Sequence, residues 1–339
     1  MDFTLKIYIA TESTSSINWI GEAYYTASHY DNVEISDRVI CISGHRSSPF
    51  DLKKILFNNT STLYSQIAKT LAFFYLCTGA SMTITKMELS SDINSIESET
   101  DFLQPFKKIL EPWQIMSPND LQNIFMFHGK EQLFLTCVIC YINAIQNDSF
   151  EQYWKSFNSI YNIIETNGKD FDKLCAIRRF IENNRSKFTN TLNFIAPDRT
   201  EDIRRLRIRE FILNDWPTER HTQAYADAIH RFSDIRIIEI FEATLPYRID
   251  FLRNKSLDVG VQNHITHCKT QNKTNNVELL CFYVLKYSYF IRNKYFHAEK
   301  ATPYFILKET AEINELSKIS GIFKHMIADF LRCNNLYLT

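Results

Sequence analysis

Glycine is scarce in this chain of 339 residues, which contains only seven. No two of them stand close enough to form a phosphate-binding loop or a dinucleotide-binding fingerprint, because both need clustered glycines. This absence excludes P-loop nucleotide hydrolases, Rossmann-fold dehydrogenases and protein kinases. The Gly-x-Ser-x-Gly nucleophile elbow and the His-Glu-x-x-His zinc motif are missing as well.

Long apolar runs are missing too. The best candidate, residues 133–145, has the length of a core helix, whereas a membrane-spanning helix needs about 18 apolar residues or more. The N-terminal residues do not have the pattern of a secretory signal peptide, and the eight cysteines are scattered. We therefore expect free thiols, a cytoplasmic location and no membrane association.

Residues able to bind zinc occur, but not at a standard spacing. His264-x-x-His267-Cys268 lies in a polar stretch that we expect to form a loop. Cys137-x-x-Cys140 lies in an apolar segment, where two thiols are core residues far more often than a redox pair. The sequence predicts no metal site and no cofactor.

The composition is that of a globular protein, with 45% hydrophobic and 14% aromatic residues. The net charge of −1 is unevenly distributed. Residues 1–105 contain seven Lys and Arg against twelve Asp and Glu, whereas residues 169–209 contain eleven against six. The basic segment is compatible with a surface that faces RNA.

The apolar pattern divides the chain into two parts. Residues 1–105 mix strand-like segments at 3–9, 38–42 and 82–89 with a helical segment at 51–77 that breaks around 58–60. From Ser117 onward we expect helices at 119–146, 148–166, 170–190, 200–213, 218–243, 277–300 and 306–334, with a linker at 90–100 and a loop at 254–276. The prediction is a mainly α protein with a smaller α+β N-terminal domain (1–105) and a helical C-terminal domain (115–339).

One helix carries the residues that point to chemistry. Residues 277–296 contain no Gly or Pro and stay apolar or aromatic through about five turns, which predicts a largely buried helix. Arg292, Asn293 and His297 lie at its C-terminal end. An Arg holds a phosphate and stabilises its developing negative charge while a His moves a proton, so this pair suffices to cleave RNA without a metal ion.

The spacing of these residues predicts a second copy of the chain. Asn293 and His297 lie four residues apart on one helix face, which suits Asn293 to orient the imidazole or to contact a phosphate. Arg292 and His297 are about 140° apart around the axis of a regular helix. Both reach one phosphate only if the helix end distorts or a partner contributes. We expect a homodimer with a composite site at its interface.

A second basic segment lies upstream. Arg204, Arg205, Arg207 and Arg209 fall within six residues, and guanidinium groups bind phosphate bidentately. The segment either grips an RNA backbone or forms a solvated helix face paired with neighbouring carboxylates. Lys294, beside the motif, adds a phosphate contact in the first interpretation.

The segment Arg292–His297 resembles the Arg-x(4–6)-His motif of HEPN domains, including the polar residue after the Arg. The aromatic helix before it and the segment Phe150–Asn162 are similar to that family too, and the resemblance covers roughly residues 115–335 with an insertion. It implies a dimeric helical bundle and, as in many members, a metal-independent endoribonuclease of toxin, abortive-infection or CRISPR-associated systems. Glu299 stands where members neutralised by a nucleotidyltransferase antitoxin carry Tyr, so the resemblance does not imply that antitoxin.

We therefore expect an anti-phage defence or toxin endoribonuclease that cleaves single-stranded RNA to a 2′,3′-cyclic phosphate, with Arg292, Asn293 and His297 as catalytic residues. An inhibitory or activating partner is expected as well, and the acidic N-terminal domain is the candidate sensor. Two alternatives stay open. One is a non-catalytic RNA- or nucleotide-binding module, and the other is an interaction protein in which Arg292 and His297 only cap a helix.

Overall fold

The computed structural model describes residues 1–12, 16–48, 50–92, 96–296, 308 and 310–338. The chain forms two compact units, of which unit 1 comprises residues 1–173 and 327–339 and unit 2 comprises residues 174–326. The boundary predicted near residue 105 falls within unit 1. Inside the described ranges, no helix combines the length and the apolar character needed to cross a bilayer.

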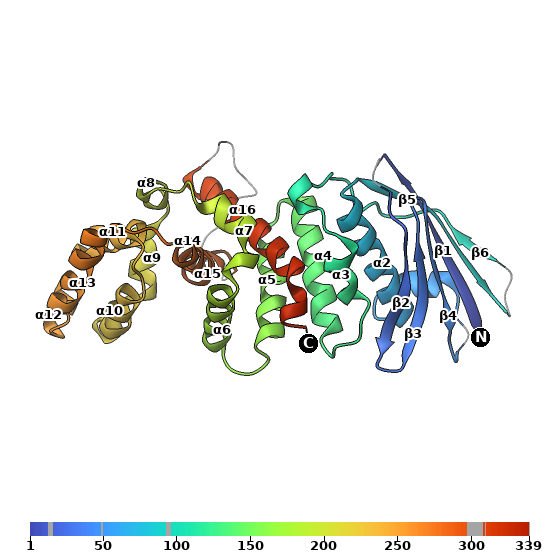
Figure 1. Cartoon of the computed structure of the whole chain (residues 1–339), viewed down its shortest axis with the longest axis horizontal. Helices are drawn as coiled ribbons and strands as arrows, with labels where there is room; N and C mark the ends of the chain where they lie inside the picture. Colours follow the sequence, from blue (N-terminus) through green and yellow to red (C-terminus); the bar gives the residue numbers. More distant parts are fainter. Residues whose placement is uncertain (13–15, 49, 93–95, 297–307, 309, 339) are drawn as a thin grey trace. The chain divides into compact units, whose positions relative to one another are not determined.

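Unit 1 contains a six-stranded antiparallel sheet in the order β2-β3-β4-β1-β5-β6 (Figure 1). Its strands are β1 Asp2–Thr11, β2 Trp19–Thr26, β3 His29–Ile35, β4 Val39–His45, β5 Met82–Ser91 and β6 Glu97–Glu99. The strands predicted at 3–9, 38–42 and 82–89 are confirmed as β1, β4 and β5. The sequence pattern does not predict β2 and β3. The linker predicted at 90–100 is wrong in part, because β6 pairs with β5 there.

Strand alternation places one face of this sheet in the core. Leu5 at the centre of β1 lies opposite Ile42 in β4 and Leu89 in β5, and all three side chains are buried. Trp19 of β2 contacts the ring of Phe73, which belongs to the helix that covers this face, at a centroid distance of 5.2 Å. The core of the sheet is therefore apolar on its helix side.

Helices complete unit 1. Their bounds are α1 Leu52–Phe57, α2 Thr62–Thr78, α3 Pro118–Leu121, α4 Glu131–Asn147 and α5 Phe150–Ile164, with the 3-10 turns η1 Pro112–Gln114, η2 Gln122–Ile124 and η7 Asn334–Leu336. The break predicted at 58–60 and the helix predicted at 148–166 are confirmed. The single helix predicted at 119–146 is wrong, because Gly129 adopts a φ of 77° just before α4.

A buried ion pair lies among β3, β4 and the residue after β4. Asp31 is fully buried and accepts hydrogen bonds from both terminal nitrogens of Arg46, at 2.7 and 2.6 Å. The guanidinium also lies 4.4 Å from the ring centroid of Tyr25. Glycine is required at position 44, because a Cβ there would collide with the Asp31 carboxylate. The two desolvated charges therefore satisfy each other.

Most remaining helices belong to unit 2. Their bounds are α6 Asp170–Asn183, α7 Thr189–Ile195, α8 Thr200–Arg204, α9 Ile208–Asp215, α10 Thr222–His230, α11 Ile235–Thr244, α12 Ile249–Asn254, α13 Asp258–Gln271, α14 Asn276–Cys281, α15 Ser288–Phe296 and α16 Ala311–Arg332, with η3 Arg185–Lys187, η4 Glu219–His221, η5 Leu245–Tyr247 and the π-helical η6 Phe282–Tyr287. α6 begins at the end of the first segment of unit 1, and α16 ends in unit 1.

Several helix predictions for unit 2 need correction. The helices predicted at 200–213 and 218–243 are each two helices, and the helix predicted at 170–190 ends at Asn183. The loop predicted at 254–276 is wrong, since most of it forms α13, which buries only Val261, Ile265 and Cys268. At the coarse level the prediction is confirmed: the protein is mainly α, with a small antiparallel sheet near its N-terminus.

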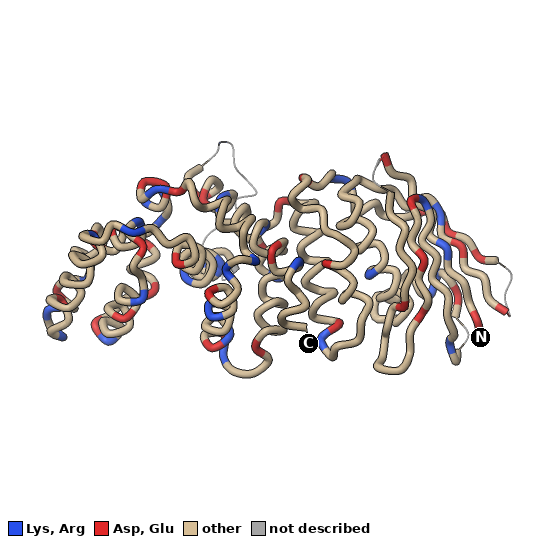
Figure 2. Tube along the Cα trace, viewed as in Figure 1, with Lys and Arg blue, Asp and Glu red and all other residues tan. Residues whose placement is uncertain are grey.

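A single buried lysine lies on the helix that covers the sheet. α2 and α4 each carry one charged residue, Lys69 and Glu131 (Figure 2). Lys69 is 3% exposed and donates to the carbonyl oxygen of Tyr24 at 2.7 Å. Burial lowers the pKa of Lys69 to about 8, although the carboxylates of Glu131 and Asp31 favour its charged form. This charge therefore destabilises unit 1 at neutral pH.

We expect Lys69→Met to stabilise the protein at pH 7 and to lose this advantage as the pH rises. The pKa of Lys69 is lower in the folded chain than its ordinary value of 10.5, so its charge costs most below pH 8 and the cost disappears between pH 8 and 10.5. Burying the charge of Lys69 costs up to ~3 kcal/mol of folding free energy. The hydrogen bond to Tyr24 that the variant loses contributes only about 1 kcal/mol, so the variant should be more stable at pH 7.

Urea unfolding at neutral and alkaline pH measures the difference between the two free energies of unfolding. The matched control is Lys53→Met, at an exposed position on α1, which should not show this pH dependence. A Lys69→Met difference that stays constant up to alkaline pH contradicts the prediction.

Candidate functional site

The predicted motif helix is one continuous helix in unit 2, comprising α14, η6 and α15. Asn275 caps its start, because its side-chain oxygen accepts from the backbone N–H groups of Val277 and Glu278. Most side chains from 279 to 291 are buried. The helix predicted from the apolar run is confirmed as far as Phe296, and its predicted burial is confirmed as far as Ile291.

A π-helical segment interrupts this helix. Its i→i+5 hydrogen bonds change the face on which later side chains lie, and such segments occur frequently at functional sites. Tyr283 and Tyr287 in this segment are buried, and both hydroxyls donate to carboxylates. Tyr283 donates to Asp198 at 2.8 Å, and Tyr287 donates to Glu315. Two phenol–carboxylate contacts, one of them fully buried, therefore fix the segment.

Arg292 and Asn293 lie near the end of α15 and are half-buried. Nη1 of Arg292 donates to the side-chain oxygen of Asn293 at 2.9 Å. The guanidinium carbon lies 5.8 Å from the ring centroid of Tyr289. His297 and Glu299 lie outside the described residues, so the predicted Arg292–His297 geometry stays a prediction.

Arg207 is one of the four arginines of the upstream basic segment, and it is bound to a carboxylate within unit 2. Its Nε and Nη2 donate to Oε2 of Glu315 at 2.8 and 2.7 Å. Its guanidinium carbon lies 5.5 Å from the ring centroid of Phe290, and Nζ of Lys294 lies 5.9 Å from the same centroid. Burial opposes the charge of Arg207, but the hydrogen bonds and charge of Glu315 raise its pKa above the ordinary value. Arg207 is therefore engaged in a structural ion pair.

The other three arginines of that segment are exposed. Arg204 and Arg205 lie 3.7 and 3.6 Å from carboxylates of the preceding turn. The guanidinium carbon of Arg209 lies 5.0 Å from the ring centroid of Tyr247. Exposed ion pairs of this kind contribute little to stability, so these side chains can exchange a carboxylate for a phosphate.

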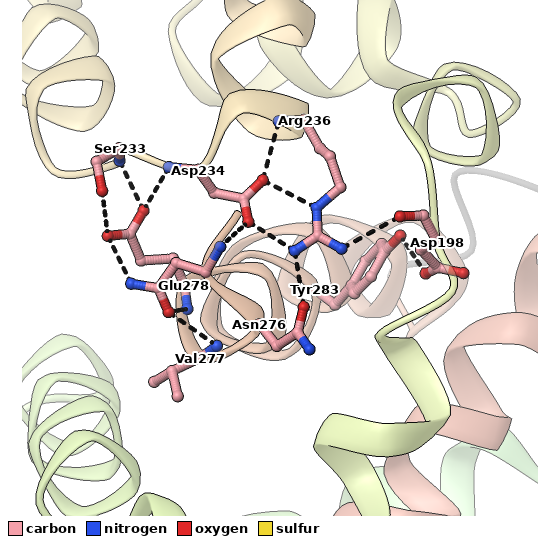
Figure 3. A network of polar contacts seen from close by, with 9 residues as sticks. Asp198, Ser233, Asp234, Arg236, Asn276, Val277, Glu278 and Tyr283 are labelled. Carbon is pink, nitrogen blue, oxygen red and sulfur yellow. Dashed lines mark hydrogen bonds and ion pairs between the residues drawn. The ribbon is translucent and has the colours of Figure 1, made fainter. Parts of the chain in front are cut away.

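A buried polar network anchors the start of the motif helix (Figure 3). Nε and Nη2 of Arg236 donate to the carboxylate of Asp234 at 3.0 and 2.6 Å, and Nη2 also donates to the side chain of Asn276 at 2.9 Å. Asp234 is fully buried and Arg236 is 5% exposed. Asp234 also caps α11, so one carboxylate connects the starts of α11 and α14.

Glu278 and Asp198 extend this network (Figure 3). Glu278 accepts from two backbone N–H groups of the loop before α11, at 2.6 and 2.8 Å. The backbone carbonyl of Asp198 accepts from Arg236 at 3.1 Å, while its carboxylate accepts from Tyr283 and from Lys318 at 2.9 Å. The motif helix is therefore bound to α11, to the loop before α8 and to α16.

The sequence did not point to these anchoring residues. Ser233-Asp234 has the pattern of a helix cap, which is the one local signal that predicts Asp234. Glu278, Asp198 and Glu315 have no such signal, because each accepts from side chains or backbone that are remote in the chain.

Lys286 and Asp215 are two further charged groups with shifted pKa values beside the π-helical segment. Burial lowers the pKa of Lys286, and the charge of Asp215 partly offsets this effect. Burial also raises the pKa of Asp215 to about 6. Structural charge pairs and functional sites both show such shifts, so these values alone assign no role to the pair.

The residues weighed as metal ligands have ordinary protein partners. His264 lies in α13 and donates to the carbonyl oxygen of Phe232 at 2.9 Å. Cys137 is fully buried, with its sulfur 3.3 Å from the Ser156 hydroxyl, and burial raises its pKa to about 12. In the part of the chain that the structure describes, no three His, Cys, Asp or Glu side chains form a metal-binding group.

Searches of protein-family models, of curated proteins and of solved structures find no match to this chain. The HEPN resemblance therefore rests on the motif, on the helix that carries it and on the segment Phe150–Asn162.

We expect Arg236→Ala to lower the free energy of unfolding by about 3–5 kcal/mol, because it leaves the Asp234 carboxylate buried without its guanidinium partner. The control Arg253→Ala removes an exposed arginine whose carboxylate neighbour Asp250 is 3.9 Å away, and should cost at most about 0.5 kcal/mol. Urea denaturation followed by circular dichroism measures both variants. Equal effects would show that the Asp234 carboxylate does not depend on Arg236.

Proposed function

We propose that this protein is a metal-independent endoribonuclease for single-stranded RNA with a HEPN-like helical domain. The observation that carries the proposal is the position of Arg292. It is a half-buried guanidinium near the end of a buried, aromatic-rich helix, five residues before His297. A phosphate-binding cation and a proton-transfer group are the two parts that such cleavage requires.

The chemistry uses the nucleophile that RNA itself supplies. His297 takes the proton of a ribose 2′-hydroxyl, the 2′ oxygen attacks the adjacent phosphorus, and the bond from phosphorus to the 5′ oxygen breaks. The leaving oxygen takes up a proton, so the products are a 2′,3′-cyclic phosphate and a 5′-hydroxyl. Arg292 stabilises the charge that grows on the non-bridging oxygens. Asn293 orients this guanidinium through the hydrogen bond of 2.9 Å between them.

A homodimer is part of the proposal. Five residues along a regular helix would correspond to about 140° of rotation, so on such a helix one chain would not direct both Arg292 and His297 at one phosphate. Two copies related by a two-fold axis bring Arg292 of one chain to His297 of the other.

The exposed cations supply contacts to the RNA backbone outside the scissile phosphate. Arg204, Arg205 and Arg209 are exposed, and the half-buried Lys294 stands two residues after the motif arginine. Arg207 has a different role in the proposal, because its guanidinium is bound to Glu315 and holds the segment in place.

The proposed biological role is that of a defence or toxin effector. An RNA-cleaving enzyme without control harms the cell that makes it, so an inhibitory or activating partner belongs to the proposal. The N-terminal sheet is the candidate region for that control, because residues 1–105 contain twelve acidic against seven basic side chains.

We expect His297→Ala to lower the rate of RNA cleavage by about 10²–10⁴-fold and Arg292→Ala by about 10²–10³-fold, through loss of proton transfer and of charge stabilisation. Single-stranded RNA is incubated with each protein in EDTA, and the fragments are analysed for 2′,3′-cyclic phosphate ends. The control is His267→Ala, which removes an exposed histidine of α13 and should cleave as the wild type does.

Equal cleavage by wild type and His297→Ala would rule out the proposed role of this histidine. Wild-type protein that binds RNA without cutting it would favour a binding module. Wild-type protein that does neither would favour an interaction protein.

The composite site is tested by mixing two inactive variants. When Arg292→Ala and His297→Ala chains exchange subunits, half of the dimers are mixed and one of their two sites is intact, so about a quarter of the wild-type rate should return. Full inactivity of the mixture, with subunit exchange verified by mass spectrometry, would contradict a site that takes its arginine and its histidine from different chains.

A further inference from the structure

The Glu315 carboxylate is bound from several sides. Its side chain is 2% exposed. Oε2 accepts from Nε and Nη2 of Arg207 at 2.8 and 2.7 Å, and Oε1 accepts from the backbone N–H of Arg207 at 3.1 Å and from the Tyr287 hydroxyl. Four donors saturate its two oxygens, so this carboxylate has one well-defined position.

These contacts join three elements of unit 2 at one point. Arg207 directly precedes α9, Tyr287 directly precedes α15, and Glu315 lies in the first turns of α16. The backbone N–H of Arg207 also donates to the Tyr287 hydroxyl at 2.8 Å, so each of the three residues is hydrogen-bonded to the other two. We name Arg207, Tyr287 and Glu315 the junction. A buried polar group that is fully hydrogen-bonded restricts its neighbours more than apolar packing does.

The junction extends along the helix that carries Arg292. The guanidinium carbon of Arg207 lies 5.5 Å from the ring centroid of Phe290, one turn beyond Tyr287. Burial raises the pKa of Tyr295, and the charge of Arg207 acts on this phenol as well. α15 therefore contacts the junction through Phe290 in its first turn.

We propose that Glu315 is a positioning residue of the site: through Tyr287 and Arg207 it holds α15, and with it Arg292, in the orientation that stabilises the charge growing on the reacting phosphate. This inference rests on the proposed ribonuclease function. In the sequence, His297 directly follows Phe296, the last residue of α15. The junction joins α15 to α16. A displacement of catalytic groups by about 1 Å costs about 10²-fold in rate.

The test separates positioning from binding and from folding. Glu315→Ala, Glu315→Gln and Tyr287→Phe are compared with wild type at a temperature where circular dichroism shows all four folded. We expect Glu315→Ala to lower kcat by about 10–10²-fold while the affinity for an uncleavable 2′-deoxy oligonucleotide changes less than about twofold. Glu315→Gln retains one acceptor oxygen and should recover most of kcat. Tyr287→Phe, which loses the hydrogen bond to Glu315 and the one from the backbone N–H of Arg207, should lie between the two.

A control shows whether lost stability alone explains the result. Asp31→Asn weakens a comparable buried ion pair in unit 1, which contains none of the proposed site residues. It should lower the melting temperature and leave kcat at the wild-type value. Amide hydrogen exchange adds a readout without catalysis: residues 288–296 should exchange about tenfold faster in Glu315→Ala and unchanged in Asp31→Asn.

The outcomes distinguish the two proposals. If wild type cleaves RNA and Glu315→Ala retains its kcat, positioning by Glu315 is overturned and the ribonuclease proposal stands. If Glu315→Ala and Asp31→Asn lose kcat equally, the effect is one of stability and positioning is again overturned. If wild type does not cleave RNA, the proposed function fails and the inference fails with it.

Discussion

Carboxylates removed from water, each bound by one arginine, are the constraint on which the rest of this structure depends. Among the described residues, the pairs of this kind whose charged atoms lie within 2.7 Å are Arg46–Asp31, Arg236–Asp234 and Arg207–Glu315. Every acid in these pairs has a side chain no more than 2% exposed, so an unpaired charge would be strongly destabilising. Such pairs add little net stability compared with apolar packing, but they accept only one arrangement of their partners. They therefore determine the relative orientation of neighbouring elements more than the free energy of unfolding.

Two of these pairs act on the same helix. Asp234 and Arg236 bind its start through Asn276, while Glu315 and Arg207 bind it at Tyr287. Between them, Tyr283 is bound to Asp198. The helix that carries Arg292 is thus fixed along its length by polar contacts, although most of its surface is apolar. This is the arrangement expected where the direction of one end of a helix matters more than the strength of the core.

The sequence predicted local features well and distant pairings poorly. The alternation of Leu5 with its neighbours predicted β1, whereas β2 buries only Ala23 and the buried alternation of β3 includes the charged Asp31. α13 was missed because it buries only three residues. The helix of Arg292 was predicted from its apolar run, but the role of Glu315 was not. A carboxylate whose partner Arg207 lies 108 positions away leaves no periodic signal. Arg207 itself was predicted as an RNA contact from composition, which does not reveal which member of a basic cluster is internal.

The π-helical segment makes the length of this helix as important as its composition. Removing one residue from the stretch Phe282–Tyr287 would allow regular i→i+4 bonding and keep the stretch apolar. The deletion would also rotate the residues after the stretch by about 100° around the helix axis and shift them by about 1.5 Å along it. The phenols of Tyr283 and Tyr287 would then no longer both meet their acids. Exchange of one apolar side chain for another should be tolerated here far better than any single-codon insertion or deletion.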